Sequence, residues 1–318
     1  MKEKMFLILD SNSILHRSFH ALPPFVNSKR EPTGAIYGFL SILWKIINKE
    51  KPDFIAACFD SAGPTLRHKE FKKYKAKRPP LDPKLGAQIE KTKELLKILS
   101  IPVFEKEGLE ADDIIGIISN KILRKQIYPK IKVKIVTGDR DLFQLIDKNV
   151  SVLFMKTGVK DFIEYDSEKV REEYEGIRPE QIPDFKALRG DPSDNIPGVT
   201  GIGRKTAISL LKEFKGIEDI YSALHSKSDK VNGIKETIRE LLINQESQAF
   251  LSKSLANIRK DDNLEFRVDD CKWGNYDKNK FIVALSDLGF KSLIKRFFSN
   301  TEKDKRLDRS KQANLFTD

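Results

Sequence analysis

The sequence is poor in cysteine, has no long apolar run and shows no ordered spacing of histidines. Only two cysteines occur in 318 residues, and Cys58 lies inside an apolar segment, where a thiol most often packs. We therefore expect no disulfide framework and a location in the reducing cytoplasm. No run approaches a membrane span, and Met5–Leu9 is cut by Asp10 before it could form a signal-peptide core. The histidines lack the spacing of zinc ligands (His16, His20, His68 and His225).

The charge balance is basic. The chain contains 58 Lys and Arg residues against 47 Asp and Glu residues, a formal net charge of +11. Such a surplus favours a polyanionic partner. The length allows one large domain, or a larger and a smaller one, and no repeat of solenoid period is present.

Against this basic background, nine carboxylates occupy five places in the chain. Three of these places follow apolar runs, Met5–Leu9, Phe54–Phe59 and Val133–Val136, that have the composition of buried parallel strands. Open α/β sheets bind ligands at the carboxyl ends of their strands, so we expect these acids to meet in one cleft. The nine are Asp10, Asp60, Glu110, Asp112, Asp113, Asp139, Asp141, Asp191 and Asp194.

So many negative charges in one cleft require neutralising cations or protonated carboxylates. Oxygen ligands favour hard divalent ions such as Mg²⁺ or Mn²⁺. Each acid also has a simpler explanation: Glu110–Asp113 opens a helix, Asp10 and Asp60 can cap helices, and Asp194 can close an Asx-turn. Capping does not require all five places to coincide with loop ends, and the joint occurrence therefore favours a metal site.

The chain divides into regions of different pattern. Residues 1–180 alternate apolar runs with helical periodicity, which predicts an α/β domain with a parallel sheet. Residues 181–297 read as helical, and residues 298–318 form a charged segment that we expect to be disordered. The clearest helical segments of the first region are Leu40–Ile47, Glu94–Leu99 and Ile114–Ile118.

A basic insert, residues 64–84, interrupts the first region. Between Arg67 and Arg78 there are seven Lys or Arg residues against one acid, Glu70. A basic helix is often only a solvated face. This one, however, directly follows Asp60, so its cations would lie over the cleft, where lysines neutralise phosphates and Tyr74 stacks on an unpaired base. The candidate DNA-binding residues here are Arg67, Lys73, Tyr74, Lys77 and Arg78.

A glycine-rich turn precedes a second basic helix. Gly198, Gly201 and Gly203 permit a tight turn that points backbone N–H groups outward at a helix start, and Arg204 and Lys205 add charge beside it. Most glycine turns are merely turns. No strand precedes this one, which argues against a dinucleotide fingerprint. We interpret it as a helix-hairpin-helix that grips a DNA backbone.

Taken together, the motifs resemble the 5′-nuclease domain of bacterial DNA polymerase I, within the flap-endonuclease family. The resemblance spans about residues 5–295 in the family's order. The matching segments are Leu9–Ser13, Phe19–Pro24, Glu31–Gly38, Phe59–Asp60, Tyr74–Pro80, Glu110–Asp113, Val136–Leu142 and Gly190–Gly198.

The resemblance implies a PIN-like domain over residues 1–180, with a helical arch at about 64–100, and a helix-hairpin-helix-type domain over 181–297. It also implies two metal ions: Asp10, Asp60, Glu110 and Asp112 would hold one, while Asp113, Asp139, Asp141, Asp191 and Asp194 would serve the other. By the same resemblance Lys75 is the arch lysine that touches the scissile phosphate, and Arg17 is a further basic residue of the site. The hairpin turn is a candidate position for K⁺.

By resemblance the activity is that of a structure-specific 5′-nuclease, which hydrolyses DNA at flaps, nicks or gaps with Mg²⁺ or Mn²⁺. The presence of all nine acids favours a catalyst. A non-catalytic junction-binding protein of the same fold is the alternative. A PIN-domain ribonuclease fits the fold but not the helix-hairpin-helix segment.

The last segment holds one more motif. Gln312–Phe316 resembles the short peptide by which bacterial replication proteins dock on the sliding clamp. A five-residue pattern is permissive, and a chance match is at least an equal alternative. Leu315 and Phe316 would anchor in an apolar pocket, and the charged spacer before them would tether the nuclease to its substrate. We expect a monomer that contacts no membrane.

Overall fold

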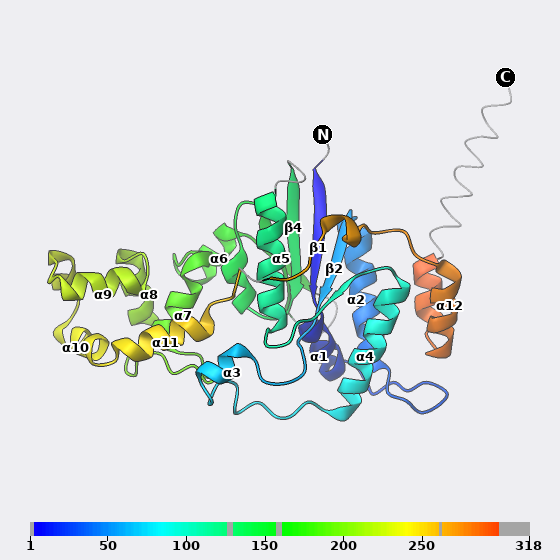
Figure 1. The fold of residues 1–318 in the computed structure, drawn as a ribbon, viewed down its shortest axis with the longest axis horizontal. Coiled ribbons are helices and arrows are strands. Elements are labelled where there is room, and N and C mark those ends of the chain that lie inside the picture. Colours follow the sequence, from blue (N-terminus) through cyan, green and yellow to red (C-terminus); the bar gives the residue numbers. More distant parts are fainter. Residues whose placement is uncertain (1–2, 126–129, 157–160, 261–262, 299–318) are drawn as a thin grey trace, which may run out of the picture.

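The computed structural model describes residues 3–125, 130–156, 161–260 and 263–298. The candidate clamp peptide Gln312–Phe316, and the predicted tail from residue 299 onward, lie outside the described residues. Figure 1 shows a sheet with its covering helices at the centre and right, and a group of helices at the left. Within the described ranges, no helix combines the length and the apolar character needed to cross a bilayer.

Six strands form one sheet with the order β3-β2-β1-β4-β5-β6. All neighbours pair in parallel except β5 and β6, which are antiparallel. The three predicted strands are confirmed as β1, β2 and β4, and the fold class is confirmed with them. The strands are β1 (Lys4–Asp10), β2 (Phe54–Cys58), β3 (Val103–Phe104), β4 (Ile131–Thr137), β5 (Val150–Met155) and β6 (Phe162–Tyr165).

The strand register aligns the carboxyl ends of the three central strands. Asp10 at the end of β1 pairs with Cys58 of β2, while Leu9 pairs with Val136 of β4. The residues that follow β1, β2 and β4 therefore emerge at the same edge of the sheet, as we expected for a ligand-binding edge.

Helices cover the sheet on both faces. Phe6 and Ile8 of β1 share a core with α5, and Leu7 and Leu9 share a core with α1, α2 and α4. Because both faces are buried, the strand is a continuous apolar run rather than an alternating one. The predicted helical segments fall on these elements. The helices are α1 (Ser11–Ala21), α2 (Gly34–Glu50), α4 (Pro83–Ile98) and α5 (Ala111–Lys125).

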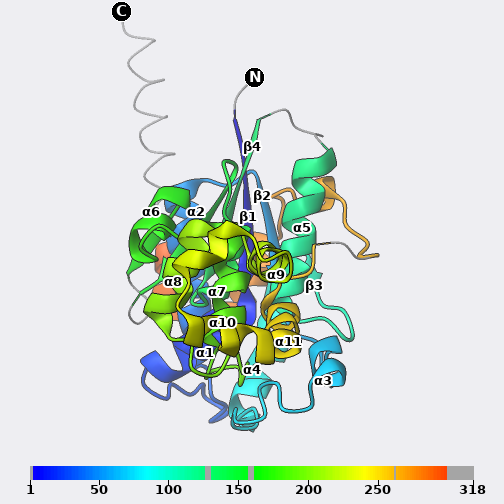
Figure 2. The same ribbon diagram turned by 90° about the vertical axis from the view of Figure 1, so that its left-hand side faces the viewer.

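A second group of helices follows the sheet. Figure 2 faces this group, with α8 to α11 in front of the sheet. Within it, α7 packs mainly against α11 and α8. Its helices are α6 (Ser167–Glu173), α7 (Ile182–Arg189), α8 (Arg204–Glu213), α9 (Ile217–His225), α10 (Glu236–Asn244) and α11 (Glu246–Ala256), with short 3₁₀ turns η2 (Pro179–Gln181) and η3 (Asp229–Gly233). A further 3₁₀ turn, η1 (Asp141–Leu145), lies between β4 and β5.

The end of the described chain departs from the predicted helical unit 181–297. After η4 (Val268–Cys271), α12 (Lys278–Asp287) packs in the core that contains α2 and α4, at the far side of the sheet (Figure 1). Trp44 of α2 stacks on Phe297 with ring centroids 4.1 Å apart, and its Nε1 donates to the carbonyl of Arg296 at 3.0 Å. The apolar periodicity indicates a helix but not which core it joins, so the prediction is wrong for this segment.

The basic insert lies across the carboxyl edge of the sheet. It contains one short helix, α3 (Leu66–Glu70), and then a series of turns up to Asp82, which caps α4 by accepting from the backbone N–H of Lys84 at 2.8 Å. Pro79, Pro80 and Pro83 explain why regular helix resumes only at α4. The segment expected by resemblance to be a helical arch is thus helical at its two ends and turn-like between them.

Candidate active site

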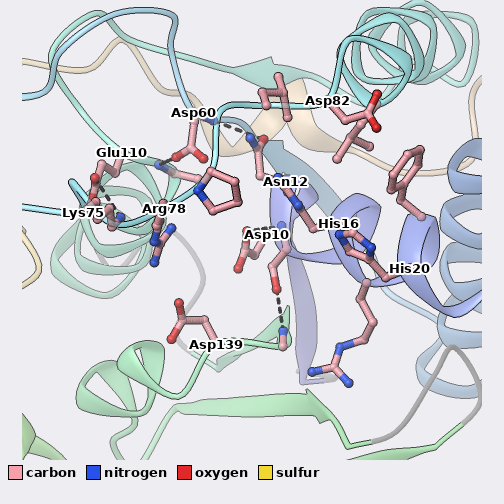
Figure 3. Close-up of a pocket in the computed structure, with 18 of the residues that line it drawn as sticks. Asp10, Asn12, His16, His20, Asp60, Lys75, Arg78, Asp82, Glu110 and Asp139 are labelled. Atoms are coloured by element: carbon pink, nitrogen blue, oxygen red, sulfur yellow. Dashed lines mark hydrogen bonds and ion pairs between the residues drawn. The ribbon is translucent and has the colours of Figure 1, made fainter. Parts of the chain in front are cut away.

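A cavity of about 960 Å³ opens at the carboxyl edge of the sheet, between α1 and the basic insert (Figure 3). Five of the nine predicted metal ligands line it, and they come from four separate places in the sequence. Lys75, Arg17 and Arg78 also line it. The five carboxylates are Asp10, Asp60, Glu110, Asp112 and Asp139.

Local hydrogen bonds fix several of these carboxylates. Asp10 accepts from the backbone N–H of Ser13 at 3.2 Å, so it caps α1, and from the Thr137 hydroxyl at 2.6 Å. Asp60 accepts from the backbone N–H of Ala111 at 2.8 Å, at the start of α5. Asp10 therefore does cap a helix. This does not exclude its predicted role as a metal ligand, because the same side chain faces the cavity beside Asp139 (Figure 3).

The electrostatics of the cavity favour a cation. Burial, with added repulsion from Asp139 and Asp60, raises the pKa of Asp10 to about 7. Burial and the charges of Asp139 and Asp10 raise the pKa of Asp112 well above its ordinary value. The pKa of Asp60 is also raised, because surrounding protein atoms partly desolvate its carboxylate. Its side chain is nevertheless exposed to the cavity. Carboxylates that resist ionisation in this way are stabilised by a positive charge placed among them.

The donor chemistry fits a hard divalent ion, since the acids of the cavity offer only oxygen. In the part of the chain that the structure describes, no three His, Cys, Asp or Glu side chains are already grouped tightly enough to form a metal site. The cavity therefore brings ligands of the right kind to one place without a closed coordination cage.

The other four predicted ligands lie outside the cavity lining, and each contacts a cation of the protein. Lys186 of α7 forms ion pairs with both Asp141 and Asp191. Arg78 contacts Asp194 at 2.5 Å, and Asp113 pairs with Arg67. Burial raises the pKa of Asp141 to about 7; burial also disfavours the ionised form of Asp191, but Lys186 and Ser193 lower its pKa to about 2.

The structure corrects the expectations for Asp113 and Arg67. Two 2.7 Å hydrogen bonds join the Arg67 guanidinium to both oxygens of Asp113, and both side chains are buried. Arg67 also donates to the carbonyls of Leu255 and Asn257, so it ties α3 to α5 and to the end of α11. Arg67 thus does not face the surface that would meet DNA, and Asp113 is engaged in a structural ion pair.

Tyr74 is corrected as well. It is 3% exposed, and its hydroxyl donates to Glu110 at 3.1 Å and to Asp194 at 3.4 Å. It therefore cannot stack on a base in this conformation. An aromatic residue in a basic segment looks the same in sequence whether it is exposed or supports the site. Lys73 and Lys77 do lie on the surface, as expected of phosphate-binding residues.

Lys75 of the basic insert and Arg17 of α1 both line the cavity. The Nζ of Lys75 lies 2.8 Å from Oε1 of Glu110, and Arg17 on α1 donates to the carbonyl of Lys156 at 3.1 Å. Lys75 has a positive φ of 52°, which marks the tight turn that holds it there. Both predicted cations thus line the same cavity as the five carboxylates, and Lys75 forms an ion pair with one of them, Glu110.

The glycine turn places its residues differently. Gly201, Gly203, Arg204 and Lys205 are exposed at the start of α8, as a backbone-binding hairpin requires. Gly198 is instead buried: a Cβ on it would meet the backbone of Gly190 at 2.1 Å, and its N–H donates to Ser252 Oγ at 3.0 Å. Its role is close packing within the hairpin, and the expectation that it contacts DNA is wrong for this conformation.

Sequence reasoning missed one face of α1. Asn12, Ser13, His16 and His20 line the cavity together with Arg17. Figure 3 shows three of them, Asn12, His16 and His20, along α1. The sequence does contain a signal for this face, because residues three and four apart lie on the same side of a helix. Ser13, His16, Arg17 and His20 have this spacing. Lys186 was also missed, although it lies on the helix that leads to Asp191.

Sequence profiles of one family cover nearly the whole chain. The family described as 5′-3′ exonuclease, N-terminal resolvase-like domain, matches residues 5–176, and 5′-3′ exonuclease, C-terminal SAM fold, matches residues 177–279. DNA polymerase I of Caldicellulosiruptor bescii is 44% identical over 292 residues, which are 91% of this chain and 33% of that protein. The chain therefore spans about a third of such polymerase relatives.

One relative matches over its full length. The 5′-3′ exonuclease of Aquifex aeolicus is 37% identical over 313 residues, covering 98% of this chain and 100% of that protein. Among solved structures, zinc-bound T5 5′-exonuclease has a TM-score of 0.64 at 20% identity (94% of this chain, 99% of that one), and the Rad2 catalytic core with DNA has 0.57 at 16% (91% and 88%). These structures share the fold, and the sequence matches show that the chain belongs to the 5′-3′ exonuclease family.

Proposed function

We propose that the chain is a divalent-metal-dependent 5′-3′ deoxyribonuclease that cleaves DNA phosphodiester bonds at flaps, nicks or gaps. The observation that carries the proposal is the cavity in which five carboxylates, three of them with raised pKa, lie beside Lys75 and Arg17. Relatives named DNA polymerase I and 5′-3′ exonuclease, and structural neighbours named with DNA and metal ions, support it.

Mg²⁺ is the proposed ion, with Asp10, Asp60, Glu110, Asp112 and Asp139 as its ligands. When bound, divalent ions supply Lewis-acid stabilisation of the charge that develops on a scissile phosphate. The acids offer hard oxygen donors at the edge of a rigid sheet, so they need not reorganise during the reaction.

The cations of the chain have a separate task. Lys75 reaches the cavity from a tight turn and pairs with Glu110. A phosphate that enters the cavity offers Lys75 a stronger acceptor, and the ammonium then donates to a phosphate oxygen as charge develops there. Arg17 faces the cavity from α1 and would hold a neighbouring phosphate in register.

The exposed basic residues position the substrate without reading its sequence. Lys73 and Lys77 on the insert, and Arg204 and Lys205 at the start of α8, lie on separate parts of the surface and suit contacts to two stretches of backbone. We also propose that the hairpin turn binds K⁺ and that the protein is a cytoplasmic monomer. A contact with the sliding clamp through Gln312–Phe316 is a further proposal, and this one rests on the sequence alone.

A cleavage assay tests the proposal. The full chain is incubated with a 5′-labelled flap duplex and Mg²⁺, with EDTA as the control, and the products are mapped at nucleotide resolution. We expect Mg²⁺-dependent cleavage near the junction. Tight junction binding with no cleavage under any divalent ion would favour the non-catalytic alternative, and preferred cleavage of single-stranded RNA would favour a ribonuclease.

A further inference from the structure

The starting point is an amine of the protein between two carboxylates that the family resemblance assigns to a metal. The Nζ of Lys186 lies 2.5 Å from Oδ2 of Asp191 and also forms an ion pair with Oδ1 of Asp141. The three side chains are only 12%, 14% and 18% exposed. Two partly buried carboxylates that face one cation in this way form a binding site that the protein itself already fills.

The backbone holds both carboxylates in place. Asp191 and Ile196 exchange two backbone hydrogen bonds of 2.9 Å, and Gly190, with φ 79°, leaves no room for a side chain against Pro197. Asp141 begins η1, with its N–H bonded to Asp139 Oδ1 at 2.9 Å. The backbone at each acid is therefore fixed, and Ser193 also holds Oδ1 of Asp191, donating to it from its N–H at 2.9 Å and from its hydroxyl at 2.6 Å. The lysine side chain, with four rotatable bonds, is the part that can move.

Lys186 differs from the cations of the basic insert. Lys75 and Arg78 contact Glu110 and Asp194 from a turn segment that carries no regular helix. Lys186 belongs to α7, and its carbonyl accepts the N–H of Gly190 at 2.8 Å, within the turn that leads to Asp191. Its ammonium is therefore tethered beside the two carboxylates and acts at a high effective concentration.

We propose that Lys186 takes the place of a second divalent ion between Asp141 and Asp191, so that a second ion binds only by displacing this lysine. The inference rests on the proposed function. It makes Lys186 a positioning residue, because the Asp141 N–H contacts Asp139 and thereby joins this pair to the cavity. A divalent ion would neutralise the charges of both acids, whereas the lysine neutralises only one of the two, so the acids attract the ion more strongly than the lysine. Binding of the ion also increases with its concentration, so a high metal concentration favours the exchange.

The test is a titration of the full chain with Mn²⁺ in the absence of DNA. Calorimetry measures the heat of binding, and electron paramagnetic resonance measures the free Mn²⁺ that remains. For the unsubstituted chain we expect one tight and one weak binding event. Lys186→Met should tighten the weak event by about tenfold or more and leave the tight one unchanged. Lys186→Arg, which keeps the charge, should leave both events unchanged. Lys186→Met combined with Asp191→Asn should weaken the second event again.

Three outcomes overturn the inference, and they separate it from the proposed function. If the second event is equally weak in Lys186→Met and in the unsubstituted chain, the lysine does not compete with metal, and the proposed function stands. If Lys186→Arg tightens the second event as much as Lys186→Met does, the charge is not what matters. If no binding depends on Asp139, tested with Asp139→Asn, the proposed function fails together with the inference.

Thermal unfolding keeps the test decisive if Lys186→Met is unstable. Without metal, this variant leaves two carboxylates facing each other, and we expect a lower melting temperature than for Lys186→Arg. Mn²⁺ should restore most of the difference, because the ion fills the vacated position. An equal loss with and without Mn²⁺ would show that the lysine is only structural, and this would overturn the inference.

Discussion

Most carboxylates of the site fall into two groups that differ in what faces them; Glu110 belongs to both, because it lines the cavity and pairs with Lys75 and Arg67. Asp10, Asp60 and Asp112 have raised pKa values in a cavity, where burial and mutual repulsion oppose their charges. Asp113 and Asp191 instead contact Arg67 and Lys186 directly. The first group needs a cation from outside, whereas the second already has one within the protein.

The difference indicates how one sequence pattern serves two purposes. Acids next to one another, such as Asp112 and Asp113, project to different sides of the same helix. One faces the cavity and the other faces the buried guanidinium of Arg67. Asp113 thereby anchors α5, α3 and the end of α11 to each other, and Asp112 is presented by that anchored frame.

The largest expected effect concerns the cavity group. Asp112→Asn and Asp139→Asn should each abolish cleavage, because each removes a charge that we assign to metal binding, while DNA affinity stays close to that of the unsubstituted chain. Single-turnover cleavage and equilibrium binding to a flap duplex measure the two properties. The control is Asp287→Asn, an exposed acid on α12. Near-normal turnover of either variant at saturating Mg²⁺ would remove that acid from the site.

Next in size is the effect of Lys75. Lys75→Ala should lower the single-turnover rate by about two orders of magnitude or more and weaken binding much less, since a cation that meets the phosphate in the reactive geometry acts on the transition state. Lys72→Ala is the matched control, because this lysine is exposed on the same insert and no role is assigned to it. A change confined to the dissociation constant would make Lys75 part of the general electrostatic attraction.

The paired group should respond in stability. Arg67→Ala leaves Asp113 buried without its partner, and we expect a loss of about 3–5 kcal/mol in the free energy of unfolding. Urea unfolding at neutral pH measures it. Arg67→Met with Asp113→Leu should recover a large part of the loss, because no buried charge is left unpaired. If the single and double variants are equally unstable, the ion pair does not account for the effect.

Much of this arrangement follows from the sequence, and the part that does not has a physical reason. The apolar run Met5–Leu9 is long enough to predict a buried strand, and Asp10 at its end predicts a residue at the sheet edge. The strand β3 has two residues and gives no periodicity. Which acid receives an internal cation depends on contacts across the fold, such as that between Arg67 and Asp113, 46 residues apart.

The same limit explains the other departures. Tyr74 and Gly198 are of residue types expected at a nucleic-acid surface, but tertiary packing decides which residues are buried. It places Tyr74 against Leu255 and Ala256, and Gly198 against Gly190. The periodicity of α12 likewise contains no information about which core the helix joins.

The melting temperature as a function of pH tests the cavity group separately, through Asp10. The pKa of Asp10 is raised from 3.8 to about 7 in the folded chain, so the folded state holds its proton more firmly than the unfolded state. Without metal, the contribution of Asp10 is therefore most stabilising below about pH 4 and is lost as the pH rises towards 7. Asp10→Asn should flatten this part of the melting-temperature profile. Saturating Mg²⁺ should flatten it too, and a profile equally steep in Asp10→Asn would assign it to another group.

The smallest effect is expected at the hairpin, away from both groups. The Arg204 guanidinium lies over the rings of Tyr174 and Phe185 and pairs with Glu175 at 3.4 Å, with its side chain 42% exposed. Lys205 is exposed beside it. Replacing both by alanine should weaken binding to every duplex sequence alike and make the slope of log K against log salt shallower by about one to two, because up to two phosphate contacts are lost. The rate at saturating DNA should change little, since neither side chain lines the cavity. Lys291→Ala, an exposed lysine beyond α12, is the control and should leave the slope unchanged. An unchanged slope in the double variant would show that the hairpin does not contact the DNA backbone through these two side chains.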